Sequence, residues 1–206
     1  EASQNIKVLI LDGPQKAHNY LETTPVLKQA LESVSFFKVD HSRSSKESCE
    51  DGSYQPDFSN YDVIVMNEGF GSYDWPEVTQ KKFEKFMSEG GGMVSIHAAN
   101  NCWPKWEAYN KMTGLGGWGG RDEKSGPYLY LNDKSEVIRD NSKGTGGSHG
   151  PQHEFEIVVR EKEHPIMKGL PSTFMHGPEE LYDKLRGPAE NMTILASAFS
   201  SKEKRG

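Results

Sequence analysis

Short apolar runs separated by longer amphipathic segments dominate the first half of the chain. Ile6 to Leu11 is such a run, and it ends at Asp-Gly-Pro, which predicts a buried parallel strand opening into a loop. Similar runs at residues 36–39, 61–66 and 93–96 predict further strands. Residues 42–59 are rich in serine, glycine and charge without periodicity, and they predict a loop.

Two segments between these runs carry apolar residues at helical spacing. Thr24 and Pro25 are typical of an N-cap and first turn, so a crossover helix is expected to follow from Val26. The second segment, residues 77–89, places Val78, Phe83, Phe86 and Met87 on one face and ends at three glycines. Alternating strands and helices predict an α/β fold of three layers with a parallel central sheet, in which ligands bind beyond the carboxyl ends of the strands.

The second half of the chain is less regular. Residues 100–150 are rich in glycine and read as a long irregular insertion within one domain that spans residues 1–206. From His153 to Val159 the apolar positions alternate with polar ones, which predicts a strand whose inward face begins with His153.

Composition narrows the functional classes. A net charge of -6 and a pI near 5.7 argue against a nucleic-acid partner. No apolar run approaches the roughly 20 residues of a membrane helix, so we expect no membrane span. The two cysteines, Cys49 and Cys102, cannot form a disulfide framework or a CxxC zinc site, and one bridge between them is left open.

Histidines occupy several positions that suit catalysis or metal binding. His97 follows a predicted strand and precedes Ala98 and Ala99, a place where many α/β enzymes carry their nucleophile. The alternative is a histidine bonded to backbone groups at a strand end. His149 and His153 flank Pro151, which excludes a regular helix and therefore a helical zinc-binding pair.

The segment from His176 to Tyr182 combines imidazole, carboxylate and phenol groups. Such groups suit zinc or a similar divalent ion, or general acid-base chemistry. For Glu179 and Glu180 the alternative is a surface loop or a helix amino terminus after Pro178.

Aromatic residues gather around the insertion. Trp103, Trp106, Tyr109 and Trp118 could stack on sugar rings, and a small satellite core is the equal alternative. The glycine run at 114–120 does not follow a strand and lacks a Gly-Lys-Ser/Thr ending, so it is a poor nucleotide signal.

Three motifs follow one another along the chain, GGGMVSIHAA at residues 90–99, HPIMKGLP at 164–171 and EELY at 179–182. In this order they resemble the ThuA-like (trehalose utilisation) family of the class I glutamine amidotransferase-like superfamily, with Glu179 in place of that family's usual Asp. The resemblance implies a flavodoxin-like fold and a link to carbohydrate metabolism, without an agreed reaction. It also places His97 where the amidotransferases carry their cysteine nucleophile, so glutaminase activity is not expected.

These observations lead to one hypothesis and one rival. The hypothesis is an enzyme acting on a sugar or oxidised disaccharide derivative, with His97, His153 and Glu180 as catalytic residues. His97 and His153 are also the candidate ligands of a divalent metal such as zinc, and the residues expected to contact the substrate are His18, Trp103, His149 and Tyr182. The rival is a non-catalytic sugar-binding or accessory module on the same scaffold.

The first residues bear on the cellular location of the protein. A start at Glu-Ala-Ser-Gln without methionine favours a periplasmic or secreted chain, with the cytoplasm as the alternative. A small-molecule carbohydrate is the expected partner, and assembly into a homo-oligomer is left open.

Overall fold

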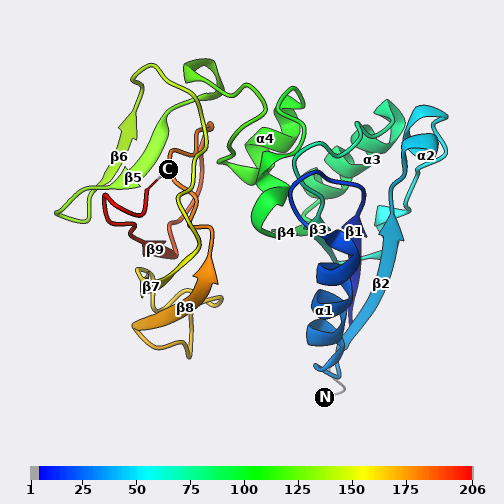
Figure 1. Cartoon of the computed structure of the whole chain (residues 1–206). Coiled ribbons are helices and arrows are strands. Elements are labelled where there is room, and N and C mark those ends of the chain that lie inside the picture. The colour runs from blue at the N-terminus through cyan, green and yellow to red at the C-terminus, as the bar shows by residue number, and fades with distance from the viewer. Residues whose placement is uncertain (1–4, 206) are drawn as a thin grey trace. The chain divides into compact units, whose positions relative to one another are not determined.

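The computed structural model describes residues 5–205, which divide into two compact units (Figure 1). The first unit extends to Tyr109 and the second begins at Asn110. The prediction of one domain over the whole chain stays a prediction. Residues 1–4, on which the expectation of export rests, lie outside the described residues.

The first unit is built on a parallel sheet with the strand order β2-β1-β3-β4. Its strands are β1 (Ile6–Asp12), β2 (Phe37–Arg43), β3 (Val63–Asn67) and β4 (Gly92–Ser95). The prediction of an α/β fold with a parallel central sheet is confirmed. Because the strands are parallel, their carboxyl ends meet at one edge of the sheet, where α/β folds place their ligands.

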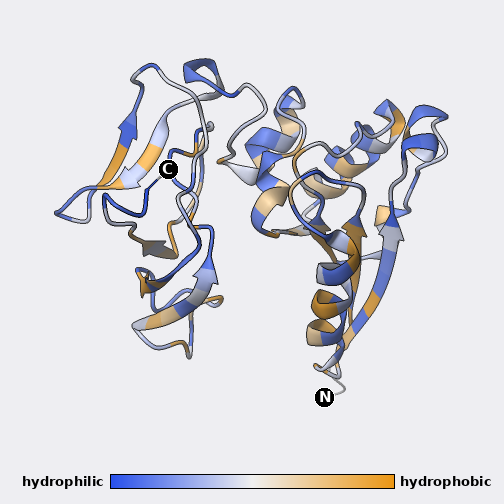
Figure 2. Cartoon of the chain, viewed as in Figure 1, coloured by the Kyte–Doolittle hydropathy of each residue, from blue (hydrophilic) through white to orange (hydrophobic). Residues whose placement is uncertain are grey.

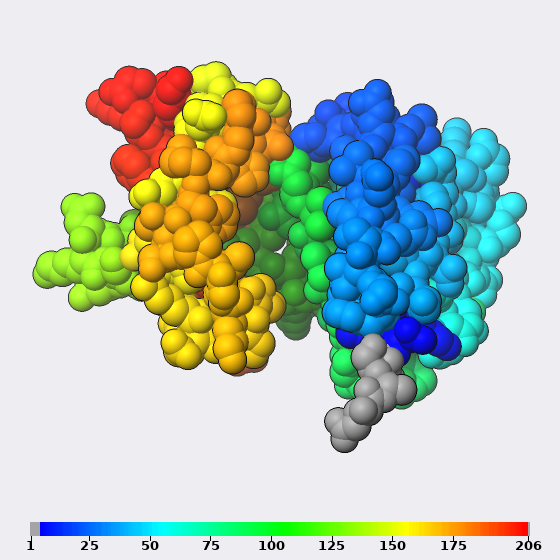
Figure 3. Space-filling model, turned by 90° about the horizontal axis from the view of Figure 1, so that it is seen from below, coloured from blue at the N-terminus to red at the C-terminus, as the bar shows by residue number. Residues whose placement is uncertain are grey.

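Burial of branched side chains holds this sheet to helix α1 (Tyr20–Glu32). Val8, Ile10 and Val65 form a buried cluster against which Leu27 and Leu31 of α1 pack. Full burial of side chains of this size contributes about 1.5–3 kcal/mol each. Figure 2 shows the hydrophobic residues concentrated in β1 and β3, and Figure 3 shows the blue atoms of α1 at the surface, where Val26 is 65% exposed.

Helix α1 begins earlier than the sequence predicts. Asn19, not Thr24, caps it, since the Asn19 side chain accepts a hydrogen bond from the Leu21 amide. Thr24 and Pro25 therefore lie inside the helix. The Thr24 hydroxyl instead donates to Asp12 Oδ2 at 2.7 Å, so its role is tertiary and not local.

The stretch between β2 and β3 is not a loop throughout. It contains the short helix α2 (Lys46–Glu50) and the 3-10 turn η1 (Phe58–Asn60). Ser45 and Ser48 form a reciprocal capping box at the start of α2, which lets a helix of five residues persist in a polar segment.

Helix α3 (Glu77–Ser88) confirms the predicted amphipathic segment. Phe83 and Phe86 are buried as expected, whereas Val78 is 43% exposed. The rings of Phe83 and Phe86 pack with Phe58, and the neighbouring Trp75 joins the same group. This aromatic packing covers the face of α3 that carries Phe83 and Phe86.

Residues 100–150 contain more regular structure than the sequence predicts. They include the last two residues of the turn η2 (His97–Asn101), helix α4 (Glu107–Thr113), the turn η3 (Glu123–Ser125) and an antiparallel pair, β5 (Tyr128–Leu131) and β6 (Val137–Asp140). A second antiparallel sheet has the order β8-β7-β9, with β7 (His153–Val159), β8 (Thr173–Glu179) and β9 (Ala196–Ala198).

Strand β7 confirms the alternating pattern, because Phe155 and Val159 are buried while Glu154 and Glu156 are exposed. Strand β8 was not predicted. Glu179 is its last residue and pairs with His153, so the reading of Glu179 as a helix start is wrong.

Membrane insertion finds no support in the helices. Among residues 5–205, none of the helices combines the length and the hydropathy needed to cross a bilayer.

Candidate functional site

His97 occupies a sharp turn between β4 and η2. Its backbone has a φ of 42°, a left-handed conformation that costs a non-glycine residue about 1–2 kcal/mol. Ala98 and Ala99, which follow it, are both buried, and the small size of their side chains permits the turn. A strained residue at the end of a parallel strand is typical of a functional position.

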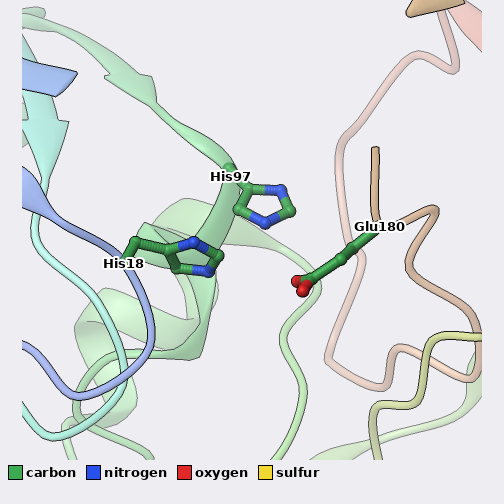
Figure 4. A group of neighbouring side chains, drawn as sticks. All are labelled: His18, His97 and Glu180. Atoms are coloured by element: carbon green, nitrogen blue, oxygen red, sulfur yellow. The ribbon is translucent and has the colours of Figure 1, made fainter. Parts of the chain in front are cut away.

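His18 lies beside His97 in the first unit. His18 belongs to the loop that follows β1, and the two ring centroids are 4.7 Å apart with the planes at 78° (Figure 4). One ring nitrogen of each residue lies within 4.8 Å of the other. Both residues are half-buried, so the pair has partial access to solvent. His18 was predicted only as a substrate contact, and the structure makes it the neighbour of His97.

A buried acid supports the same edge of the sheet. Asp12, the last residue of β1, is fully buried and accepts two hydrogen bonds from Arg43 at 2.9 and 2.8 Å. His41 Nε2 lies 2.8 Å from Asp12 Oδ1, and the Thr24 hydroxyl bonds Oδ2. Burial alone would raise the pKa of Asp12, but the hydrogen bond from Arg43, followed by those from Thr24 and His41, outweighs burial and lowers that pKa.

Glu68 is a second buried acid, directly after β3. Its side chain is fully buried, and Oε1 accepts a hydrogen bond from the Ser44 hydroxyl at 2.9 Å. Burial raises the pKa of Glu68 to about 7, against the opposing hydrogen bonds from serine hydroxyls. Gly13 lies against this carboxyl, since a Cβ at residue 13 would meet Glu68 Oε2 at 2.9 Å. The first unit thus holds one ionised acid and one acid that titrates near neutrality.

Trp103 lies in the aromatic packing of the first unit. Its ring is 4.8 Å from that of Trp75 and 4.9 Å from that of Tyr109, and only 6% of the residue is exposed. Its indole nitrogen donates to the Tyr73 carbonyl at 3.0 Å. This placement favours the satellite-core interpretation for Trp103, and its contact with a substrate stays a prediction.

Cys102 is also part of the interior of the first unit. Its thiol donates to the Gly69 carbonyl at 3.2 Å, and the residue is 2% exposed. Cys102 and Cys49 are both buried thiols, and the bridge left open by the sequence is not formed.

In the second unit, two rings lie beside that of Tyr182. The ring of Trp118 is 4.8 Å from that of Tyr182 at 65°, and the ring of His149 lies 6.0 Å from that of Tyr182 at 30°. His149 Nε2 lies 3.7 Å from Glu180 Oε2, and Figure 4 draws the Glu180 side chain. We call Trp118, His149, Glu180 and Tyr182 the aromatic cluster.

Backbone ladders hold the aromatic cluster in place. The Trp118 amide donates to the Gly146 carbonyl at 2.7 Å, and Ser148 and Asp183 exchange two backbone hydrogen bonds at 2.9 and 2.8 Å. Three loops are joined in this way, residues 116–121, 144–149 and 182–187. Trp118 has a φ of 53°, so its conformation is imposed by these surroundings.

A buried guanidinium lies at the centre of these loops. Arg186 is fully buried, donates to the carbonyls of Gly126, Ser142 and Gly144 at 2.9–3.0 Å, and lies over the Tyr128 ring at 3.8 Å. Such a network replaces the water that a guanidinium would otherwise bind. Arg186 therefore acts as a structural support for the loops.

His153 begins β7 in the second unit. Its Nδ1 lies 2.9 Å from the Pro151 carbonyl oxygen, and its Nε2 lies 3.5 Å from the Ser200 hydroxyl. His97 and His153 belong to different units, and their action as a pair stays a prediction.

Sequence reasoning missed three of these features. The buried acids lie at strand ends, Asp12 as the last residue of β1 and Glu68 directly after β3. This position could be seen in the sequence, but many loop residues without a functional role share it. The role of Arg186 carried no sequence signal, because its partners are backbone carbonyls. Trp118 was noted among the aromatic residues but was not selected as a site residue.

Comparisons with known proteins agree with this architecture. A crystal structure of a ThuA-like protein from Parabacteroides merdae is 42% identical, with a TM-score of 0.91, covering 97% of this chain and 70% of that one. A ThuA-like protein from Bacteroides uniformis, at 20% identity and a TM-score of 0.58, covers 95% of this chain and 69% of that one and shows the fold alone. A comparison with curated proteins found no match.

The family model ThuA, described as trehalose utilisation, matches residues 7–206, nearly the whole chain. The three motifs, His97 and all of the parallel sheet except its first residue, Ile6, lie within this range. The chain therefore belongs to the ThuA family.

Proposed function

We propose that the chain is an enzyme of carbohydrate metabolism that acts on a sugar or an oxidised disaccharide derivative through the His18 and His97 pair. The observation that carries this proposal is the 4.7 Å separation of the two rings at the carboxyl edge of the sheet, with His97 held in a strained backbone conformation. Trehalose utilisation, the description of the family, supports the choice of a sugar substrate.

Two neighbouring imidazoles allow two kinds of chemistry. Neutral imidazoles are good zinc ligands, and two of them can supply half of a tetrahedral coordination shell. Without a metal, one imidazole can accept a proton from a sugar hydroxyl or a water molecule while the other donates a hydrogen bond. Glu180, the carboxylate of the sequence hypothesis, belongs to the second unit, and its part in the reaction stays a prediction.

The nature of residue 97 argues against glutaminase chemistry. A histidine cannot form the thioester that a cysteine nucleophile forms, and Cys102 is buried with its thiol bonded to a carbonyl. Reaction through proton transfer or a metal ion is therefore the consistent proposal for this turn.

Metal analysis of four proteins tests the proposal. These are the wild type, His97→Asn, His18→Gln and, as control, His164→Ala, in which the altered histidine lies in a turn of the second unit. Asparagine tolerates a left-handed backbone, so His97→Asn removes the imidazole while keeping the turn. After dialysis against a weak chelator, we expect about one zinc per chain in the wild type and control, and a loss in both site variants.

The reaction itself is followed by proton NMR with trehalose and with a trehalose oxidised to a ketone at one ring hydroxyl. We expect conversion by the wild type and a fall of about 100-fold or more in His97→Asn, the usual scale for loss of an acid-base group. Absence of metal together with retained activity would leave acid-base chemistry. Full activity in both His97→Asn and His18→Gln would overturn the proposal, and sugar binding without conversion would favour the rival, a non-catalytic sugar-binding module.

A further inference from the structure

The aromatic cluster of the second unit has the composition of a sugar-binding surface. Trp118 and Tyr182 present two ring faces at 65° to each other, and Trp118 is half-buried, not sealed in a core. Pyranose rings carry apolar CH faces that pack on aromatic rings, whereas their hydroxyls need polar partners at the rim. Both kinds of group occur in this cluster.

The polar partners are His149 and Glu180. His149 is exposed, and its Nδ1 lies 2.8 Å from the Gly150 carbonyl oxygen, which leaves Nε2 directed to the side of Glu180 at 3.7 Å. The Glu180 amide donates to Glu179 Oε1 at 2.8 Å, which orients the backbone of Glu180. An imidazole and a carboxylate at this spacing can bond adjacent hydroxyls of one sugar ring.

The cluster is preorganised. Trp118 takes a left-handed backbone conformation, and the loops that carry Trp118, His149 and Tyr182 are joined by backbone hydrogen bonds of 2.7–2.9 Å. Gly147 permits this arrangement, because a Cβ there would lie 2.7 Å from the Trp118 amide nitrogen. Fixing side chains before a ligand arrives lowers the entropy cost of binding.

We infer that the aromatic cluster is a binding subsite for a neutral pyranose ring, with Trp118 as the stacking platform and His149 and Glu180 as hydroxyl partners. The choice of a sugar rests on the proposed function. The subsite itself rests on residues of the second unit alone, and it adds Trp118 and a binding mode to the residues predicted from the sequence.

Saturation-transfer NMR and calorimetry with trehalose test the subsite. Trp118→Asn removes the ring and retains tolerance of the left-handed backbone, Trp118→Phe restores a smaller ring, and Trp106→Phe is the control within the buried aromatic packing. We expect millimolar binding in the wild type, about tenfold weaker binding in Trp118→Asn, and recovery in Trp118→Phe. Trp106→Phe should bind as the wild type does.

Two outcomes would overturn the inference. One is equal affinity of wild type and Trp118→Asn, with both proteins folded by circular dichroism. The other is the absence of trehalose binding in the wild type. Binding that depends on Trp118 but persists in His97→Asn, without conversion of either sugar, would support the subsite while the proposed reaction fails.

Discussion

Glu68 and Asp12 are both buried acids at strand ends, yet the stability that each provides changes with pH in opposite directions. The pKa of Asp12 is lowered by its hydrogen bonds, so the stability it provides is present above its unfolded pKa and is lost as the pH falls below that value. Burial raises the pKa of Glu68 from 4.5 to about 7. Its stabilising contribution is therefore complete below about pH 4.5 and is lost as the pH rises through 7.

Glu68→Gln should remove this second dependence. In the wild type, ionisation of Glu68 should lower the free energy of unfolding by roughly 3 kcal/mol between pH 4.5 and pH 8. Glutamine has nearly the same shape as the protonated acid but does not ionise. The free energy of unfolding of the variant should therefore not show this decrease. Urea denaturation at pH 5 and pH 8 measures this. If the wild type and Glu68→Gln differ in free energy of unfolding by the same amount at pH 5 and at pH 8, the Glu68 carboxyl does not titrate in this range.

Secondary structure elements differ in how far the sequence predicted them. Strands β1 and β3 and helix α3 agree with the predicted segments within a few residues, because burial on both faces or on one face leaves a clear apolar pattern. Strand β4 also agrees, although none of its residues is buried. Helix α1 was misplaced because two candidate caps lie close together, and Thr24 serves a tertiary contact instead. Strand β8 was missed because much of it is exposed and it contains Gly177 and Pro178, which usually interrupt strands.

Side-chain neighbours were harder to predict than elements. The motif that contains His97 was recognised, but the approach of His18 depends on the path of the loop after β1, and no periodic pattern encodes that path. The same holds for the aromatic cluster, whose members come from three separate loops.

Loop geometry predicts the effect of one glycine substitution. Gly147 has a φ of 88°, and an added Cβ would lie 2.7 Å from Gly117 Cα and from the Trp118 amide nitrogen. Gly147→Ala should therefore destabilise the second unit by about 2 kcal/mol or more and weaken trehalose binding. Gly177→Ala is the matched control, since nothing lies within 4 Å of its added Cβ. Thermal unfolding of both variants measures the effect, and equal melting temperatures would contradict it.

At the scale of the whole molecule, the two cysteines act as reporters of the first unit alone. Cys49 and Cys102 both lie in that unit, and they are 8% and 2% exposed. Burial, together with the nearby Glu68 carboxyl, raises the pKa of Cys49 to about 11. A thiol in this state has very little thiolate at pH 8 and reacts slowly.

Thiol titration at pH 8 should therefore be slow in the native protein and reach two thiols per chain only in denaturant, in agreement with the two cysteines of the sequence. The comparison with unfolding followed at Trp118, which lies in the second unit, would show whether the two units unfold together. Rapid reaction of one native thiol would contradict the burial of these residues.

The buried Arg186 holds together the glycine-rich loops beside the aromatic cluster. In the language of supramolecular chemistry, the glycine-rich loops are a host and the guanidinium is its guest, held by the carbonyls of Gly126, Ser142 and Gly144 and by the Tyr128 ring. Glycine at 126 and 144 keeps the wall of this host thin, since a Cβ at either position would lie within 2.4 Å of another atom. Because a guanidinium keeps its proton throughout the pH range in which proteins fold, this clasp does not loosen with acid or base.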